Sequence, residues 1–393
     1  MKISYGWLKT FVPGLPEPSE LARHLSMAGL GVESLKPWTS AMEGIVVGEV
    51  LAREKHPNAD RLSLCVVEAG GERYSVVCGA PNVVAGMKAP FALVGARLPG
   101  GKTIQAATIR GVASHGMLCS QTELGLGADA SGIMSLPASA VTGEPFVPNP
   151  EDWIFDLEVT PNRGDLLSVL GVARQLSATL SLPWALPWPV PGIPDPAGGT
   201  PWRVTIADPA GCGLYTARLL TGVKVGPSPE WMQKRLAACG LRPINNVVDI
   251  TNYLLLETGH PLHAFDAAKL SGQRIDVRRA AAGDKLKTLD GVDRPLNLEV
   301  LVIADGAGAV AAAGIMGGAS SEIGPGTHEV LLEAAWFDPV RTRRGARSLG
   351  LSTEASYRFE RGVDPGGVVQ ASDRAAQLMV ELAGATVGSP RLR

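Results

Sequence analysis

Hydrophobic and polar positions alternate in short runs along the first third of the chain. Four such runs cover residues 45–51, 62–67, 74–78 and 89–94, with Gly, Pro and Asn residues between them. Apolar runs of this length, separated by turn residues, are typical of short β-strands. Their spacing predicts a small closed or nearly closed β-barrel within residues 40–150.

Polar side chains stand at the predicted turns of this barrel. They are His56, Asn58, Asp60, Asn82, Arg110 and Ser120. The ordinary interpretation of Asn58, Asp60 and Asn82 is that they cap turns. Their occurrence together and in this order favours a second interpretation, in which the turns contact RNA. Both remain open from the residues alone.

The predicted barrel has no excess of positive charge. Residues 40–150 contain eight Lys or Arg against nine Asp or Glu. Any RNA contact here should therefore depend on shape, hydrogen bonds and a few local cations, and should weaken only modestly with salt.

The segments on either side of the barrel predict a small α/β domain, made of residues 1–39 and 151–182. A helix is expected from Pro18 until Gly29 and Gly31 end it, and a strand at 153–159 precedes an amphipathic helix at 169–180. We expect the second segment to pack on the first, so that the barrel is inserted into this domain.

A proline-rich stretch follows, at residues 183–201. Its prolines are Pro183, Pro187, Pro189, Pro191, Pro194, Pro196 and Pro201. Because proline cannot donate a backbone hydrogen bond and favours extended conformation, this stretch predicts a stiff linker.

Residues 202–390 predict an α+β domain. Strands are expected at 202–206, 215–219, 275–277, 285–289, 300–304 and 330–332, and helices at 229–238 and 246–257. The strand at 300–304 precedes Gly306 and Gly308, which fits a loose dinucleotide-binding fingerprint. Too few residues separate Gly308 from Gly314 for the required helix, so a hairpin turn at Asp305 is the better interpretation.

The composition of the chain is that of a globular protein with several domains. The chain has 393 residues, enough for two to four domains, and its 45% apolar and 19% charged residues are ordinary for a globular protein. The 5% aromatic content argues against base stacking as the main mode of recognition. Five scattered cysteines indicate neither disulfides nor a zinc site, and no signal peptide or membrane-length apolar run is apparent, so a cytoplasmic location is expected.

Several motifs resemble the β subunit of bacterial phenylalanyl-tRNA synthetase. In the C-terminal domain they are residues 241–253, 259–266, 313–318, 331–335 and 352–356, and elsewhere 3–8, 160–165 and 357–365. The barrel turns likewise resemble the OB-fold tRNA-binding domain of several synthetases. The resemblance spans essentially the whole chain and implies an α+β multidomain protein, in which an OB-fold barrel is inserted into the N-terminal domain and an editing domain follows.

The resemblance also implies partners and activity. Family members are α2β2 enzymes whose β subunit is about twice this length, and the full heterotetramer uses ATP and Mg²⁺. For this chain it implies no cofactor of its own, binding to tRNA(Phe) and to an α subunit, no DNA or membrane partner, and no aminoacylation without the α subunit. The activity expected of the chain itself is hydrolysis of mischarged tyrosyl-tRNA(Phe).

Proofreading needs a specific chemistry, because an apolar synthetic pocket rejects tyrosine in place of phenylalanine only weakly. A second site requires a buried acceptor for the tyrosine hydroxyl, space for the ring and groups that hold water at the ester. By the resemblance, Glu333 is the acceptor, His263 and Asn252 line the ester and water, and Gly317 allows close backbone approach. Thr353 and Ala355 form the wall that limits the ring, and Arg242 lies near the tRNA end.

Structural alternatives exist for these residues. His263 alone could be a satisfied core histidine, and Gly317 could simply form a turn. Glu257, His260, His263 and Asp266 mimic metal-ligand spacing, although Gly259 and Pro261 interrupt the helix that would align them. Arg341, Arg343, Arg344 and Arg347 could form a solvated helix face or a tRNA contact. A non-catalytic tRNA-binding module is the alternative function.

Overall fold

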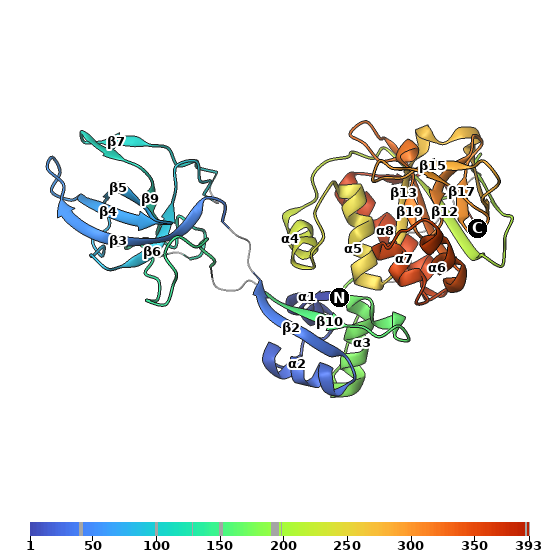
Figure 1. The fold of residues 1–393 in the computed structure, drawn as a ribbon, viewed down its shortest axis with the longest axis horizontal. Coiled ribbons are helices and arrows are strands. Elements are labelled where there is room, and N and C mark those ends of the chain that lie inside the picture. The colour runs from blue at the N-terminus through green and yellow to red at the C-terminus, as the bar shows by residue number, and fades with distance from the viewer. Residues whose placement is uncertain are drawn as a thin grey trace. The chain divides into compact units, whose positions relative to one another are not determined.

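The computed structural model describes residues 1–38, 42–98, 101–127, 129–148, 152–189, 196–197, 199–389 and 391–392. The chain separates into two compact units (Figure 1): Met1–Lys36 together with Asp152–Arg393, and Pro37–Glu151. The expected domain limits at 39/40, 150/151 and 390 lie outside the described residues, as do Pro191 and Pro194.

The unit Pro37–Glu151 is built on a curved antiparallel sheet with the strand order β5-β4-β3-β6-β9. Its strands are β3 (Ile45–Lys55), β4 (Ser63–Ala69), β5 (Glu72–Cys78), β6 (Lys88–Ala92) and β9 (Met117–Leu118), and β7 (Ala107–Ile109) and β8 (Val112–Ser114) form a separate hairpin. The backbone amide of His115 donates to the carbonyl of Ser75 at 2.8 Å, so the β5 edge meets the segment between β8 and β9. The four strands predicted from the alternation are all present.

The two N-terminal segments pack on each other, as expected. Strand β10 (Asp152–Glu158) lies between β1 (Lys2–Ser4) and β2 (Gly31–Trp38). Helices α1 (Tyr5–Phe11), α2 (Pro18–Met27) and α3 (Val169–Leu180) share a hydrophobic cluster with this sheet. Leu8, Phe155 and Leu176 share a hydrophobic cluster with Leu254 of the C-terminal region, so these segments belong to the same compact unit.

The described start of the proline-rich stretch is not a free spacer. The amide of Ala185 donates to the carbonyl of Phe11 at 3.0 Å. The Trp188 ring meets the Phe11 ring edge-on, with centroids 5.6 Å apart, and the Arg374 guanidinium lies over the Trp188 ring. The apolar side chains among the prolines therefore attach this segment to its unit.

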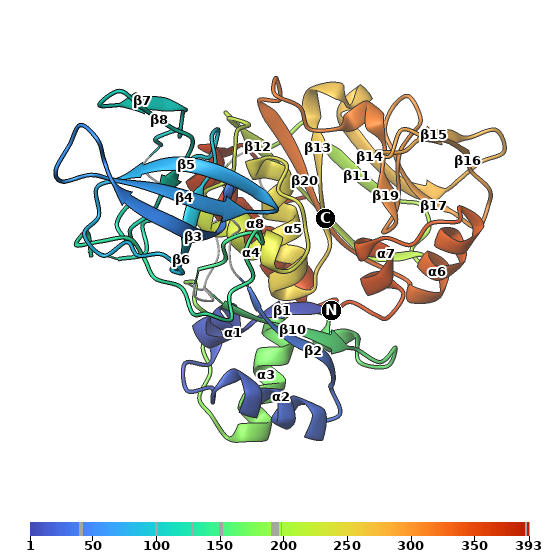
Figure 2. The ribbon, with the colours of Figure 1, turned by 60° about the vertical axis from the view of Figure 1, so that its left-hand side comes forward.

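The C-terminal region is layered, with two sheets between helices (Figure 2). One sheet has the order β13-β20-β12-β21 and the other β11-β14-β17-β18-β19. The bounds of the first are Leu262–Asp266, Glu329–Phe337, Cys212–Thr221 and Thr386–Val387, and those of the second Arg203–Ile206, Arg274–Arg279, Leu301–Ala304, Ala309–Ala312 and Met316–Gly317. The remaining elements are α4 (Glu230–Ala238), α5 (Asn246–Thr258), α6 (Pro339–Ser348), α7 (Glu354–Phe359), α8 (Gly367–Ala383) and the hairpin of β15 (Lys285–Lys287) and β16 (Asp293–Pro295).

The central strand β20 packs against a different layer on each of its two faces. Val330 and Leu332 point to the hydrophobic cluster that contains α5 and α8, whereas Leu331 and Ala335 point to the cluster shared with the second sheet. Because side chains alternate along a strand, Glu333 points with Leu331 and Ala335 into the space between the two sheets. A carboxyl group there is exceptional, since most of its neighbours are apolar.

The segment that resembled a dinucleotide-binding fingerprint is a hairpin. Strand β17 turns directly into the antiparallel strand β18, with no helix between them. Asp305 stabilises the turn by accepting hydrogen bonds from the amides of Ala307 and Gly308 at 2.8 and 3.0 Å. The dinucleotide alternative is therefore wrong.

Candidate active site

A cavity of about 440 Å³ lies beside Glu333 in the C-terminal region. Its walls come from α5, β13, β17 to β20 and the start of α7, and Ile303, Ala311 and Phe359 are among its apolar lining residues. Six of the seven predicted site residues line it: Asn252, His263, Gly317, Glu333, Thr353 and Ala355. Segments far apart in the sequence thus meet around one cavity that is open to solvent on one side.

Glu333 is held by a tyrosine of the neighbouring strand. The hydroxyl of Tyr215 donates to Oε2 of Glu333 at 2.8 Å. Burial raises the pKa of Glu333 to about 7, and burial beside this carboxylate keeps the pKa of Tyr215 well above its usual value. Oε1 of Glu333 makes no hydrogen bond with any described residue, so one carboxyl oxygen is available to a ligand.

His263 stands next to Glu333 across the strands. The two residues are paired between β13 and β20, so their side chains project from the same face of the sheet. Burial lowers the pKa of His263 to about 4, which leaves the imidazole neutral at pH 7. The ring rests edge-on against Phe265, with centroids 4.4 Å apart, and makes no hydrogen bond within the described part of the chain. This geometry does not fit the interpretation of a satisfied core histidine.

Gly317 leaves room for that imidazole. A Cβ atom at this position would lie 2.3 Å from Cε1 and 2.7 Å from Nε2 of His263. The carbonyl of Gly317 accepts a hydrogen bond from the amide of Leu289 at 3.1 Å, which holds the strand end close to the ring. Any side chain here would displace His263 or the backbone.

Thr353 and Ala355 form one wall of the cavity. Thr353 caps α7, accepting from the amide of Ser356 at 3.0 Å, and its hydroxyl donates to the carbonyl of Ile315 at 2.8 Å. The hydroxyl of Thr353 thus connects α7 to the strand leading to Gly317. Ala355 follows in the first turn and presents only a methyl group.

Asn252 and Arg242 differ in placement. Asn252 is half-buried in α5 and lines the cavity, and its amide makes no hydrogen bond with a described residue. Arg242 is exposed in the loop before α5 and is not among the residues lining the cavity. The structure therefore brings six of the predicted residues together and leaves Arg242 outside.

Two of the residues with metal-like spacing, Asp266 and Glu257, have separate partners. Asp266 accepts from the hydroxyl of Thr327 at 2.7 Å, and Glu257 lies 3.6 Å from the guanidinium of Arg374. Within the described ranges, no group of three or more His, Cys, Asp and Glu side chains is arranged to hold a metal ion.

Tyr215 was not anticipated from the sequence. It lies 118 residues before Glu333, and its position became apparent only through the pairing of β12 with β20. Its one sequence signal is the alternation that puts a tyrosine on the buried face of a strand.

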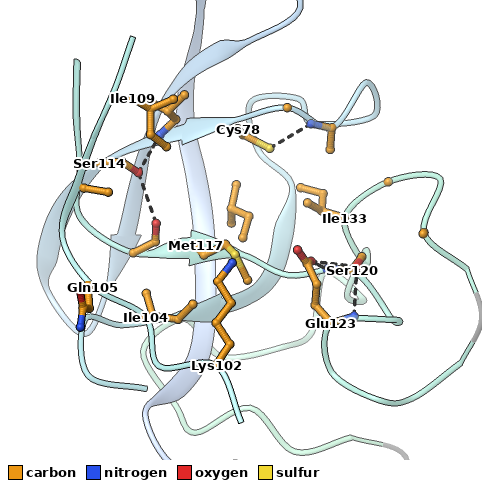
Figure 3. A pocket seen from close by; sticks show the side chains of 18 of the residues that line it. Cys78, Lys102, Ile104, Gln105, Ile109, Ser114, Met117, Ser120, Glu123 and Ile133 are labelled. Carbon is orange, nitrogen blue, oxygen red and sulfur yellow. Dashed lines mark hydrogen bonds between the residues drawn. The ribbon is translucent and has the colours of Figure 1, made fainter. Parts of the chain in front are cut away.

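The unit Pro37–Glu151 has its own cavity, of about 620 Å³ (Figure 3). Lys102, Gln105, Ser120 and Glu123 give it polar edges. Ser120 is the predicted tRNA-binding residue that lines it, and its hydroxyl donates to Oε2 of Glu123 at 2.8 Å.

The other predicted tRNA-binding residues mostly hold loops. His56 is buried, and its Nδ1 accepts from the amide of Asn58 at 3.1 Å. The side-chain amide of Asn58 donates from its Nδ2 to the carbonyl of Arg110 at 3.0 Å. Asn82 makes two bonds with the backbone of Ile133, at 2.8 and 2.9 Å.

Asp60 and Arg110 are exposed. Asp60 pairs with Lys55 at 2.7 Å, and both side chains are largely in solvent. The side chain of Arg110 makes no ion pair with a described residue, and its backbone adopts the left-handed conformation, with φ of 49°. Asn58 and Asn82 are exposed as well, but their side chains are bonded to backbone groups of other loops.

No helix in the described part of the chain is both long and apolar enough to cross a membrane.

Two family models match the chain. A putative tRNA binding domain matches residues 45–145, and a B3/4 domain matches residues 211–384. The curated relatives compared with the chain carry the name phenylalanine–tRNA ligase beta subunit. That of Syntrophus aciditrophicus is 48% identical over 100% of this chain and 49% of its own length. That of Moorella thermoacetica is 50% identical over 100% and 50%, and that of Anaeromyxobacter dehalogenans 49% identical over 98% and 49%.

The chain spans about half the length of the curated relatives it matches. The two family models cover most of the unit Pro37–Glu151 and all residues that line the cavity around Glu333. The chain belongs to the family of phenylalanine–tRNA ligase beta subunits.

Proposed function

We propose that this chain binds tRNA(Phe) and hydrolyses tyrosine from mischarged tyrosyl-tRNA(Phe). The observation that carries the proposal is Glu333, a carboxylate in an apolar cavity with one oxygen held by Tyr215 and the other unoccupied by a described residue. A hydroxyl-bearing ring can satisfy Oε1, whereas phenylalanine leaves it unpaired.

The reaction uses the other residues of the cavity. The tyrosine ring fits between the apolar lining and the wall of Thr353 and Ala355, and its hydroxyl donates to Glu333. Neutral His263 and the Asn252 amide hold a water at the ester carbonyl. Water adds to the carbonyl carbon, the bond to the ribose oxygen breaks, and free tyrosine and a tRNA 3′-hydroxyl result.

We propose the following fold, partners and location for the chain. The curved sheet of Pro37–Glu151 is an OB-fold that binds tRNA, inserted between residues 1–39 and 151–182, and residues 202–390 form the editing domain beyond the 183–201 linker. The chain assembles with an α subunit into an α2β2 enzyme in the cytoplasm. ATP and Mg²⁺ serve aminoacylation in that heterotetramer, and this chain uses neither.

Hydrolysis of tyrosyl- and phenylalanyl-tRNA(Phe) by the purified chain tests the proposal. We expect preference for the tyrosyl ester, and Glu333→Ala should reduce that preference roughly ten- to a hundredfold by removing one charged hydrogen bond. Ala355→Trp should slow both reactions because it fills the ring space.

Two results would count against the proposal. If the wild-type chain releases neither amino acid, the alternative of a non-catalytic tRNA-binding module holds. If Glu333→Ala slows both hydrolyses equally, Glu333 supports the water or the fold and does not select the substrate.

A further inference from the structure

Helix α6 carries arginines on its outer face that have no partner in the described part of the chain. Arg343, Arg344 and Arg347 are exposed, and none of them forms an ion pair or hydrogen bond with any residue that the structure describes. Arg341 differs, because its Nη1 donates to Oδ1 of Asp208 at 2.7 Å. Three uncompensated positive charges thus lie within about one helical turn.

The inner face of α6 lies against a wall of the active-site cavity. A Cβ atom on the buried Gly345 would lie 3.2 Å from Cδ1 of Ile315, which lines that cavity. The carbonyl of Ile315 accepts from Thr353, the cap of α7, and α6 and α7 are in contact (Figure 2). The arginines therefore lie on the outer face of a helix whose inner face supports one wall of the cavity.

The chemistry of this face fits the sugar-phosphate backbone of RNA. Arginine presents a planar, permanently charged fork that matches phosphate oxygens. The whole chain has a formal net charge of −2, so an overall positive charge does not account for binding of RNA at this face. The helix contains no aromatic residue and only Val340 as a large exposed apolar side chain, so it lacks the anchors typical of a protein interface.

We propose that Arg343, Arg344 and Arg347 bind backbone phosphates of the tRNA acceptor arm and hold its 3′ end at the cavity. This proposal rests on the hydrolytic function proposed above and names the surface that positions its substrate. The arginines are positioning residues, since they touch phosphates away from the ester.

The test compares two triple variants with equal loss of charge. The first is Arg343→Ala, Arg344→Ala, Arg347→Ala, and the control is Arg23→Ala, Lys36→Ala, Arg203→Ala, which removes three exposed cations from other parts of the same unit. The probes are an acceptor-stem minihelix ending in CCA and an anticodon stem-loop, each titrated over a range of salt concentrations. A third variant, with lysine at the three α6 positions, keeps the charge.

We expect the α6 triple variant to bind the minihelix at least about tenfold more weakly at low salt, and the slope of log affinity against log salt to fall by roughly two to three. The lysine variant should keep most of that slope, and the control triple and the anticodon stem-loop should show little change. In tyrosyl-tRNA hydrolysis the α6 triple should raise KM and leave kcat nearly unchanged. Thermal unfolding of all variants checks that the fold is intact.

The outcomes separate this proposal from the proposed function. If wild-type chain hydrolyses tyrosyl-tRNA and the α6 triple neither raises KM nor weakens the minihelix, the α6 proposal is wrong and the hydrolytic function stands. If the wild-type chain does not hydrolyse the ester but minihelix binding still depends on α6, the hydrolytic function is wrong and the binding of the acceptor arm by α6 stands. If the control triple weakens binding equally, net charge explains the effect. Loss of α-subunit binding with unchanged minihelix affinity would make α6 a protein interface and would overturn the proposal.

Discussion

The two regions that carry candidate functional residues use their polar side chains in opposite ways. Around the cavity of the C-terminal region, Asn252 and His263 make no hydrogen bond with a described residue, and Glu333 has one oxygen free. In the unit Pro37–Glu151, Asn58 and Asn82 are occupied by backbone partners in other loops. Polar atoms of a cavity that have no protein partner remain accessible to a ligand, so they indicate ligand binding more strongly than polar groups that hold turns.

The difference also concerns what surrounds each group. Burial moves the pKa of Glu333 up to about 7 and that of His263 down to about 4, which gives the cavity a carboxyl and an imidazole with altered proton affinities. The tRNA-binding residues predicted for the other unit lie on loops that border solvent. We therefore expect substitutions in the cavity to change chemistry, and most substitutions in those loops to change stability.

The largest effect should come from Gly317→Ala. The new methyl group would lie 2.3 Å from Cε1 of His263, so the imidazole must move from its place beside Glu333. We expect hydrolysis of tyrosyl-tRNA to fall by at least about a hundredfold, because small displacements of a positioning group cost this much.

Gly326→Ala is the matched control for Gly317→Ala. It meets nothing within 4 Å and should leave hydrolysis unchanged. Full activity of Gly317→Ala, measured as kcat/KM, would show that the His263 ring position is unimportant.

The second effect is a pH dependence of stability caused by Glu333. Its pKa is about 7 in the folded chain and 4.5 in the reference state, so folding favours its protonated form. Glu333 thus contributes no penalty below pH 4.5, and destabilises the fold increasingly as pH rises from 4.5 to 7. Between these limits the free energy of unfolding of the wild-type chain should fall by about 2 to 3 kcal/mol relative to Glu333→Gln.

Denaturant unfolding of both proteins across this pH range measures the difference. The neighbouring histidines, His260 and His263, are present in both proteins, so their opposite contribution cancels. A constant difference between the two proteins would mean that Glu333 stays ionised throughout.

The sequence predicted the secondary structure well where local pattern decides it. Strand β4 and helix α5 follow from alternation and from an apolar run that Asn245 caps. The role of Asn82 could not be predicted, because its partner Ile133 is 51 residues away and the pairing depends on the folded loops. The contact of Tyr215 with Glu333 could not be predicted for the same reason, because the two residues are 118 positions apart. Arg242 was predicted from a sequence resemblance, and the structure shows it in an exposed loop outside the cavity.

A smaller effect is expected for Asn82→Ala. This change removes both hydrogen bonds to Ile133 and should destabilise the unit Pro37–Glu151 by about 2 kcal/mol. Asn252→Ala is the counterpart in the cavity, where it should change stability by less than about 0.5 kcal/mol but lower hydrolysis. Thermal unfolding and kcat/KM of both variants test this contrast between a structural and a functional asparagine. Equal changes in stability and activity for the two variants would contradict it.

The smallest effect should come from Arg110, which is an exception among the loop residues because its side chain makes no ion pair within the described ranges. Its φ of 49° is tolerated by asparagine, so Arg110→Asn removes the charge with little strain in the turn. If Arg110 contacts one phosphate, the slope of log tRNA affinity against log salt should fall by roughly 0.7 to 0.9, and Arg110→Lys should restore it. Asp60→Asn, which leaves Lys55 unpaired in the same unit, should instead leave affinity unchanged or raise it slightly. An Arg110→Asn variant with an unchanged slope would mean that this turn is structural too, and the contrast between the two regions would then extend to every predicted tRNA-binding residue except Asp60.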